Sequence, residues 1–189
     1  MKIISALISA ICIFTLNVPQ NIDVQLQYEI INDADEYVED YVEEYVTCSI
    51  NAKTVSMGDI VPSEEVLFCG ENCAEILLRL LEANGLEAVF YGTTDEDFYL
   101  TGIKGLDTTR AQVAEELKLY LSENDIDYED SVSEDGFLGE FDFTEAAGWM
   151  YIVNGEIPDV GMNSYIPKAG NNIEFIFTLY YGEDIYLIN

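Results

Sequence analysis

Histidine is absent from this sequence of 189 residues, and its absence removes much of enzyme chemistry. Serine and cysteine nucleophiles that rely on an imidazole base need histidine, and so do zinc sites built on imidazole ligands. The sequence also lacks a glycine-rich phosphate loop. We therefore expect a protein that is not an enzyme and that requires no cofactor.

Basic residues are scarce: seven lysines and arginines face 37 aspartates and glutamates, and the formal net charge is −30. A protein that binds nucleic acid needs a basic patch to displace counterions from the phosphates, and anionic lipid surfaces also attract basic segments. We therefore expect neither nucleic acid nor an anionic membrane surface as a partner. The charge instead favours solubility through self-repulsion.

Long apolar runs are missing too, since a helix that crosses a bilayer needs about 20 such residues. The most apolar stretch, from Ile3 to Leu16, follows Lys2 and precedes polar residues at 17–20. This pattern is typical of a secretory signal peptide. We expect residues 1–20 to be removed on export, leaving a secreted or cell-surface protein with no stable membrane span. The alternative is a short buried apolar strand or helix.

Cysteines are few, and Cys12 belongs to the expected signal peptide. The other three, Cys48, Cys69 and Cys73, are candidates for one disulfide in an oxidising compartment. Cys69 and Cys73 lack the two-residue gap of redox and zinc motifs, so we expect a structural role for them and no metal site. A hairpin of residues 46–50 and 64–69 favours a bond from Cys48 to Cys69 over one from Cys48 to Cys73, although geometry decides between them.

Residues 21–45 are expected to form an acidic leader ahead of a domain over residues 46–189. Tyrosine and valine recur at helical spacing along the leader, which indicates either a short amphipathic helix or a solvated segment. The alternative is that this stripe docks on a partner protein. The stripe consists of Tyr37, Val38, Tyr41, Val42, Tyr45 and Val46.

Two helices are expected in the domain. Asn72 and Glu75 form a capping-box pair at the start of the first, which ends at Asn84-Gly85. A second helix is expected over residues 109–122, with Thr109 and Gln112 as its cap pair. The face of the first helix that packs on a sheet consists of Ile76, Leu77, Leu80 and Leu81.

Strand patterns fill most of the rest of the domain, and Asn154-Gly155 indicates a tight turn. Loops are expected at 51–63 and 123–140. The acidic residues at 125–130 lack the glycine and glutamate positions of a calcium loop, so we expect a solvated loop there. The order of elements predicts an α+β fold in which one helix packs on a small mixed sheet. The strands are expected at 46–50, 64–69, 87–91, 98–103, 149–153, 172–180 and 184–188.

One segment carries a family resemblance. The stretch Gly148-Trp149-Met150-Tyr151-Ile152-Val153-Asn154-Gly155, with the later Gly161, Tyr165 and Gly170, resembles the signature of secreted bacterial domains of unknown function related to the C-terminal domain of transcobalamin. The animal vitamin B12 carriers, transcobalamin and intrinsic factor, have a similar tryptophan strand, followed by turns like those at 155–158 and 165–167. The resemblance extends less specifically from about residue 46 to 185. It implies a β-grasp-like fold.

The resemblance also implies a ligand. In the carriers this domain closes over one face of a corrinoid that a separate helical domain holds, and the present sequence contains no comparable helical region. The positions carried over as ligand contacts are Trp149, Met150 and Tyr151, with Asn154 and Tyr165 beside them. Met150 replaces a polar glutamine of the carriers, which puts one polar contact in doubt.

The expected function is therefore a non-enzymatic extracellular binding module for a corrinoid or another planar small ligand, acting alone or with a partner protein. Two alternatives stay open. The domain can serve as a surface protein–protein interaction or adhesion module without a small ligand. Trp149 and Tyr151 can also pack in the core with their polar atoms satisfied locally.

Overall fold

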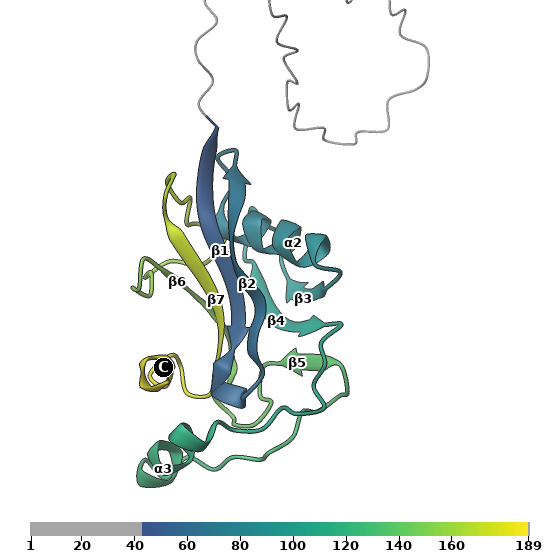
Figure 1. Cartoon of the computed structure of the whole chain (residues 1–189), viewed down its shortest axis with the longest axis vertical. Coiled ribbons are helices and arrows are strands. Elements are labelled where there is room, and N and C mark those ends of the chain that lie inside the picture. The colour runs from purple at the N-terminus through teal and green to yellow at the C-terminus, as the bar shows by residue number, and fades with distance from the viewer. Residues whose placement is uncertain (1–42, 189) are drawn as a thin grey trace, which may run out of the picture. The chain divides into compact units, whose positions relative to one another are not determined.

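A four-stranded mixed sheet forms the centre of the computed structural model, which describes residues 43–188 (Figure 1). The strands are β1 (Glu44–Ala52), β2 (Gly58–Phe68), β6 (Gly148–Val153) and β7 (Asn172–Thr178), in the order β2-β1-β7-β6. β1 pairs antiparallel with β2 and parallel with β7. β6 pairs antiparallel with β7 and forms one edge of the sheet.

A second sheet and the main helix lie on one side of the first sheet. β3 (Glu87–Tyr91), β4 (Tyr99–Lys104) and β5 (Phe137–Gly139) are antiparallel, in the order β3-β4-β5. Figure 1 shows them on the same side as helix α2 (Cys73–Ala83). The hydrophobic core joins side chains from both sheets and α2 in a single cluster.

Helix α2 begins and packs as its sequence predicts. The Asn72 side-chain oxygen accepts a hydrogen bond of 3.0 Å from the Glu75 amide, and the Glu75 carboxylate accepts one of 3.0 Å from the Asn72 amide. This reciprocal pair satisfies exposed amides of the first turn. The predicted apolar face is buried: Ile76, Leu77, Leu80 and Leu81.

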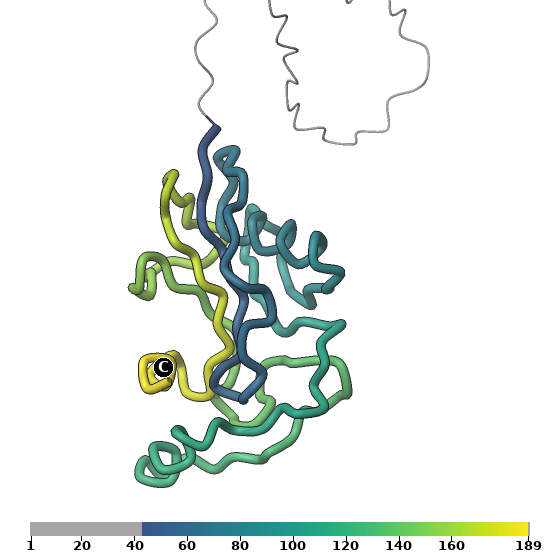
Figure 2. The backbone as a smooth tube through the Cα atoms, in the orientation of Figure 1, coloured from purple at the N-terminus to yellow at the C-terminus, as the bar shows by residue number. Residues whose placement is uncertain are grey.

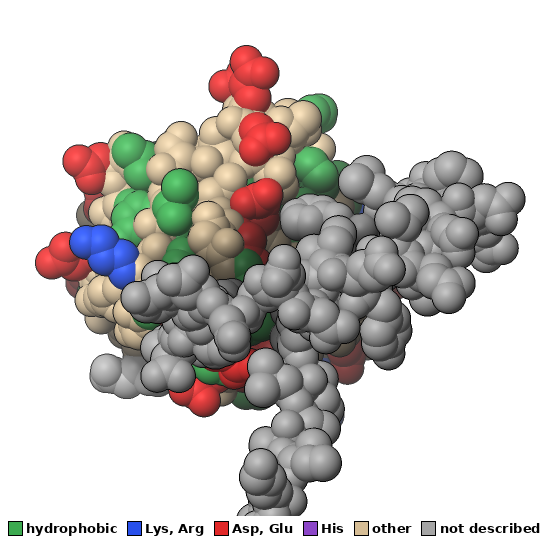
Figure 3. All heavy atoms as spheres, turned by 90° about the horizontal axis from the view of Figure 1, so that it is seen from above, with side chains coloured by type: hydrophobic (Ala, Val, Ile, Leu, Met, Phe, Trp, Pro, Cys, Tyr) green, Lys and Arg blue, Asp and Glu red, His purple; other side chains and the backbone are tan. Residues whose placement is uncertain are grey.

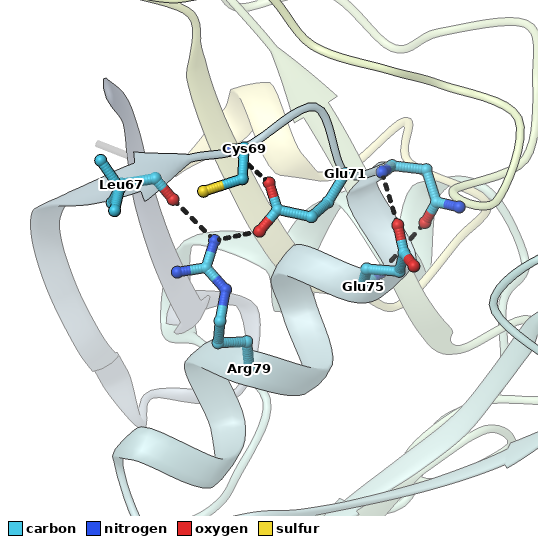
Figure 4. Close-up of polar contacts among 6 residues, drawn as sticks. Leu67, Cys69, Glu71, Glu75 and Arg79 are labelled. Atoms are coloured by element: carbon cyan, nitrogen blue, oxygen red, sulfur yellow. Dashed lines mark hydrogen bonds and ion pairs between the residues drawn. The ribbon is translucent and has the colours of Figure 1, made fainter. Parts of the chain in front are cut away.

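Arg79 ties α2 to the strand that precedes it (Figure 4). Its guanidinium donates one hydrogen bond to the backbone oxygen of Leu67 and one to the Glu71 carboxylate, each 2.8 Å long. The same carboxylate accepts a bond of 2.6 Å from the Cys69 amide. The connection from β2 into α2 is therefore held at three points.

The expected α+β class is confirmed, and the four-stranded sheet with α2 has the β-grasp-like order. A hairpin is followed by a helix and later by two strands, of which the last, β7, lies next to β1 and parallel to it. The second helix, α3 (Glu115–Glu123), is inserted between β4 and β5.

The start expected for the second helix is wrong. Thr109 does not cap it; its amide and hydroxyl both donate to the Asp107 carboxylate. The amides of Gln112 and Ala114 donate to backbone oxygens of Val55 and Thr54. Because contact with this distant segment holds residues 112–114 outside a helix, α3 begins only at Glu115.

Three strand and loop boundaries also differ from expectation. The loop expected at 51–63 is shorter in the structure. The 3-10 helix η1 (Lys53–Val55) and the left-handed Ser56 turn the chain, and β2 begins at Gly58. Part of the loop expected at 123–140 pairs with β4 as β5. The strand expected at 184–188 is instead the 3-10 helix η2 (Ile185–Leu187).

Figure 2 shows α3 and the C-terminal segment at the same end of the fold, where the Tyr120 hydroxyl donates to the Glu183 carboxylate at 3.2 Å.

Acidic side chains are scattered over the face seen in Figure 3, and basic ones are few. Within residues 43–188 no helix is both long and apolar enough to cross a membrane. The expected signal peptide and all but the last three residues of the leader lie outside the described residues.

Candidate functional site

Trp149 lies on the edge strand β6, where its side chain is half-buried. The indole N–H donates a hydrogen bond of 2.9 Å to the backbone oxygen of Leu138 on β5, and so connects the two sheets. The ring also packs edge-on against Phe177 of β7, with the ring centroids 5.4 Å apart. The polar atom of Trp149 is therefore satisfied internally, and only its ring is left for contact with a ligand.

Two hollows meet at Trp149, and we call them together the β6 groove. The aromatic hollow has a volume of about 320 Å³ and the apolar hollow one of about 230 Å³. Tyr99, Trp149 and Met150 line both hollows. The aromatic hollow is completed mainly by Phe141, Glu145, Thr178 and Tyr181, and the apolar hollow by Phe98, Leu100, Tyr151, Ile157 and Met162.

Two other depressions are larger, about 520 and 470 Å³, but their linings are less suited to a ligand. Both are rimmed by acidic side chains, among them Asp127 and Glu145. Ligand sites are mostly apolar and aromatic, with a few polar groups that fix orientation. The β6 groove is therefore the better candidate.

Met150 is held in the groove by the C-terminal segment. The backbone of Gly182 passes close to its thioether, so close that a Cβ on Gly182 would lie 2.7 Å from the Met150 sulfur. Gly182 has a φ of 89°, which also favours glycine. The positive φ is the stronger reason for glycine here, because the Met150 thioether is the end of a flexible side chain that can move aside.

Tyr151 contributes to the groove through its ring alone. Its hydroxyl donates a hydrogen bond of 2.7 Å to the backbone oxygen of Val160, and burial raises its pKa well above the ordinary value. The ring packs edge-on against Tyr165, with centroids 6.0 Å apart. Tyr165 thus supports Tyr151 but lines neither hollow.

Asn154 also lies outside the groove. It and Gly155 have φ values of 53° and 84°, as the predicted tight turn requires. The Asn154 side-chain oxygen accepts a hydrogen bond of 2.9 Å from the Asn172 amide. Of the five predicted contact positions, the structure therefore places Trp149, Met150 and Tyr151 in the groove and leaves Asn154 and Tyr165 outside it.

Comparison with protein families gives one match: a domain of unknown function, DUF4430, matches residues 74–178, which is more than half of the chain. The chain belongs to this family. The DUF4430 match begins in α2, ends with β7 and includes the whole of β6. No curated protein matches the sequence.

Sequence reasoning missed three aromatic residues that line the aromatic hollow of this DUF4430 protein. Tyr99, Phe141 and Tyr181 are 53%, 67% and 73% exposed. The Tyr99 hydroxyl donates a hydrogen bond of 2.7 Å to the Glu140 carboxylate, which raises its pKa and fixes the ring at the rim. The strand pattern over 98–103 includes Tyr99, and the one over 172–180 ends just before Tyr181, but neither indicates a site. Phe141 and Tyr181 themselves lie in turns, which have no hydrophobic periodicity that could identify them.

The cysteines of the DUF4430 protein do not fit the favoured pairing. Cys48 lies opposite Glu64 on β2, whereas Phe68 at the end of β2 lies opposite Glu44. Cys69 is five residues beyond Glu64, so at about 3.4 Å per residue it lies roughly 17 Å away from Cys48 along the strands. Disulfide-bonded Cα atoms lie within about 7 Å. The register therefore argues against a bond from Cys48 to Cys69.

The other pairing considered from the sequence, a disulfide from Cys48 to Cys73, remains possible. In the structure both are thiols and both are fully buried in the core; burial raises the pKa of Cys73, and the charge of a thiolate at Cys48 would raise it further. Cys73 begins α2, and its amide donates to the backbone oxygen of Tyr165 at 2.9 Å. A bond between them would join β1 to α2.

In the reduced protein, we expect Cys48 and Cys73 to resist alkylation at pH 8 until the chain unfolds. Burial raises the pKa of each thiol from 9.0 to about 12, so the reactive thiolate is scarce in the folded state. Because the folded-state pKa is the higher one, the free energy of unfolding should hold below pH 9 and fall as the pH rises towards 12. Peptide mass spectrometry after iodoacetamide labelling, with and without urea, measures the protection. Labelling of either residue in native buffer as fast as in urea would contradict it.

Proposed function

We propose that this chain is a non-enzymatic extracellular binding module whose ligand, a corrinoid or another large planar molecule, lies in the β6 groove. The supporting observation is the position of Trp149, which lines the groove from the edge of the sheet and is not enclosed in the core. The segment that resembles the vitamin B12 carriers forms β6 and its turn. The resemblance and the groove therefore fall on the same strand.

The groove provides mainly aromatic contacts to a ligand, and fewer polar ones. A flat apolar ligand can pack on the rings of Trp149 and Tyr99. β6 pairs only with β7 among the described strands, so its outer edge has backbone groups that can bond to amide groups on the rim of a ligand. The Trp149 N–H and the Tyr151 hydroxyl are already bonded and are expected to stay so.

The size of the groove favours a partner protein. Each hollow lies at or below the lower end of the range for small-molecule sites, which is about 300 to 1,000 Å³. A corrinoid is wider than either hollow, so it would lie across both and leave its other face exposed. A second protein that covers this face would complete the site.

Titration of the full chain with cobalamin and cobinamide tests the proposal. Trp149 is the one tryptophan of the sequence, so its fluorescence reports on the groove alone. We expect saturable quenching together with a shift in the corrinoid absorption spectrum. Tyr99→Leu should weaken binding by about tenfold, as expected for an aromatic side chain at the centre of an interface. Unchanged spectra at high micromolar ligand would overturn binding by this protein alone.

The matched control is Tyr186→Leu. Tyr186 is an exposed tyrosine of the C-terminal segment that lines neither hollow. We expect this variant to bind as the parent protein does. An equal loss of affinity in the Tyr99 and Tyr186 variants would show that the quenching does not report on the groove.

A second candidate function is surface interaction or adhesion without a small ligand. Aromatic side chains are also exposed away from the groove, such as Tyr91 on β3. Partner isolation from the envelope of the producing organism, with and without residues 21–45, separates the two candidates. A partner lost with the leader favours this function, and a partner lost in Trp149→Ala favours the first.

A further inference from the structure

The aromatic hollow is surrounded by four rings from separate parts of the chain. Tyr99 begins β4, Trp149 lies on β6, and Phe141 and Tyr181 lie in turns. No ring–ring contact joins any two of these four within the described residues. The four rings line a hollow of about 320 Å³ without packing on one another.

Two of these aromatic residues have an unfavourable backbone conformation. Phe141 has a φ of 66° and Tyr181 a φ of 49°, a region that bulky side chains rarely adopt. Such conformations persist only where the surroundings hold them, and they concentrate at functional sites. Phe143 also has a positive φ, but it is buried and packs against Phe177. Phe141 and Tyr181 have no comparable place in the core, because both side chains are largely exposed.

Hydrogen bonds hold both strained turns. The Phe141 amide donates to the backbone oxygen of Ala147 at 3.1 Å. On the other side of the hollow, the amide of Gly182 donates to the Thr178 hydroxyl at 2.8 Å, and the amide of Tyr180 donates to the Asp184 carboxylate at 3.1 Å. The fold therefore presents two exposed aromatic rings to the same space at a cost in backbone strain.

The charge around the hollow has one sign. Glu145 lines it, Glu140 is bonded to the Tyr99 hydroxyl at its rim, and no lysine or arginine is among the lining residues. The whole chain has a formal charge of −30. Aromatic faces also attract cations through their quadrupoles, and they bind quaternary ammonium groups well. An anionic ligand would be repelled by every one of these groups.

We propose that the aromatic hollow binds a small organic cation that carries an alkylated ammonium group. The proposal rests on the proposed function, in which the β6 groove is the ligand site, and it adds the charge and chemical class of a ligand for one half of that groove. The cationic group would lie among Tyr99, Phe141, Trp149 and Tyr181, with Glu145 as its counter-ion. A volume of about 320 Å³ is sufficient for such a group.

A matched pair of probes tests the charge requirement: choline and its neutral isostere 3,3-dimethylbutanol, which has the same shape. The full chain is titrated with each, and Trp149 fluorescence and calorimetry follow the binding. We expect saturable binding of choline and at least about tenfold weaker binding of the isostere, which corresponds to the loss of the cation–π and carboxylate contacts. Raised salt should weaken choline binding, since the Glu145 carboxylate is exposed.

Variants locate the site. Glu145→Gln and Tyr181→Leu should each weaken choline binding by about fivefold to tenfold. Tyr186→Leu and Glu87→Gln, which change similar exposed residues outside the hollow, should not. Urea denaturation of each variant checks that the fold is intact. For Tyr181→Leu the midpoint should change little, because leucine is about as strained as tyrosine at this φ and the exposed ring loses only its contact with Tyr180.

The outcomes are distinct. Equal binding of choline and its isostere, or no binding of choline, would overturn the cation proposal. If choline fails while cobinamide still quenches Trp149, the groove is a ligand site for neutral molecules and the proposed function stands. Equal effects of the Tyr181 and Tyr186 variants would place the bound cation outside the hollow and would overturn the proposal as well.

Discussion

Replacement of Asp184 by alanine is expected to lower the free energy of unfolding by about 3 kcal/mol. The side chain is fully buried. Its carboxylate accepts hydrogen bonds from the Leu179 amide at 2.7 Å, the Tyr180 amide at 3.1 Å and the Thr178 hydroxyl. Hydrogen bonds to a charged group are the stronger kind, and alanine would leave buried donors without partners.

The adjacent exposed residue provides the control. Within residues 43–188 the exposed Glu183 side chain accepts one hydrogen bond, from the Tyr120 hydroxyl, so Glu183→Ala should change the free energy of unfolding by less than about 0.5 kcal/mol. Urea denaturation followed by circular dichroism measures both variants, with the midpoint and the slope fitted separately. Similar midpoints for the two variants would contradict the assigned role of Asp184.

Asp184 also connects stability to the candidate site. It fixes the turn that contains Tyr181, and the backbone of Gly182 in the same turn packs on Met150. Loss of the carboxylate should therefore loosen one wall of the aromatic hollow.

Local signals predicted helix α2 well. The capping pair Asn72 and Glu75 and the apolar face of the helix lie within one continuous segment, so their effect does not depend on the rest of the fold. The turn at Asn154-Gly155 was predicted for the same reason, because these residues accept the positive φ values that the turn needs.

The element boundaries that the sequence predicts wrongly are set by contacts outside the local segment. Residues 112–114 are held by backbone bonds to η1, and the Asp184 carboxylate holds residues 178–180, so that β7 ends at Thr178 and the 3-10 helix η2 follows. The short strand β5 is positioned by pairing with β4, and the Trp149 N–H bonds to its residue Leu138. None of these contacts leaves a periodic pattern in the segment that it shapes.

Some residues of the candidate site could be predicted from the sequence, and others could not, for the same reason. Trp149, Met150 and Tyr151 were identified because they are consecutive residues of one strand with a family resemblance. Phe141 and Tyr181 reach the hollow only through the left-handed conformation of two turns, which a sequence pattern does not report for aromatic residues.

The second large effect is expected from Phe177→Ala, which should lower the free energy of unfolding by about 3 to 5 kcal/mol. Phe177 is fully buried on β7, opposite Trp149 in the sheet register. Its ring packs edge-on against both Trp149 and Phe143, with centroids 5.4 and 6.4 Å apart. Alanine would leave a cavity beneath the groove and remove both aromatic contacts.

Trp149 reports on this cavity directly. Without the Phe177 ring, the indole loses the packing contact on its inner face, so its emission should change in the folded protein. Phe177→Leu fills most of the volume and should cost clearly less, because only the aromatic contacts, about 0.5 to 1.5 kcal/mol each, are lost along with a smaller cavity. If alanine and leucine cost the same, or if the emission of the alanine variant is unchanged, Phe177 does not support the groove. Since Phe177 is a core residue that contacts Trp149, the result decides whether the shape of the proposed binding site depends on core packing.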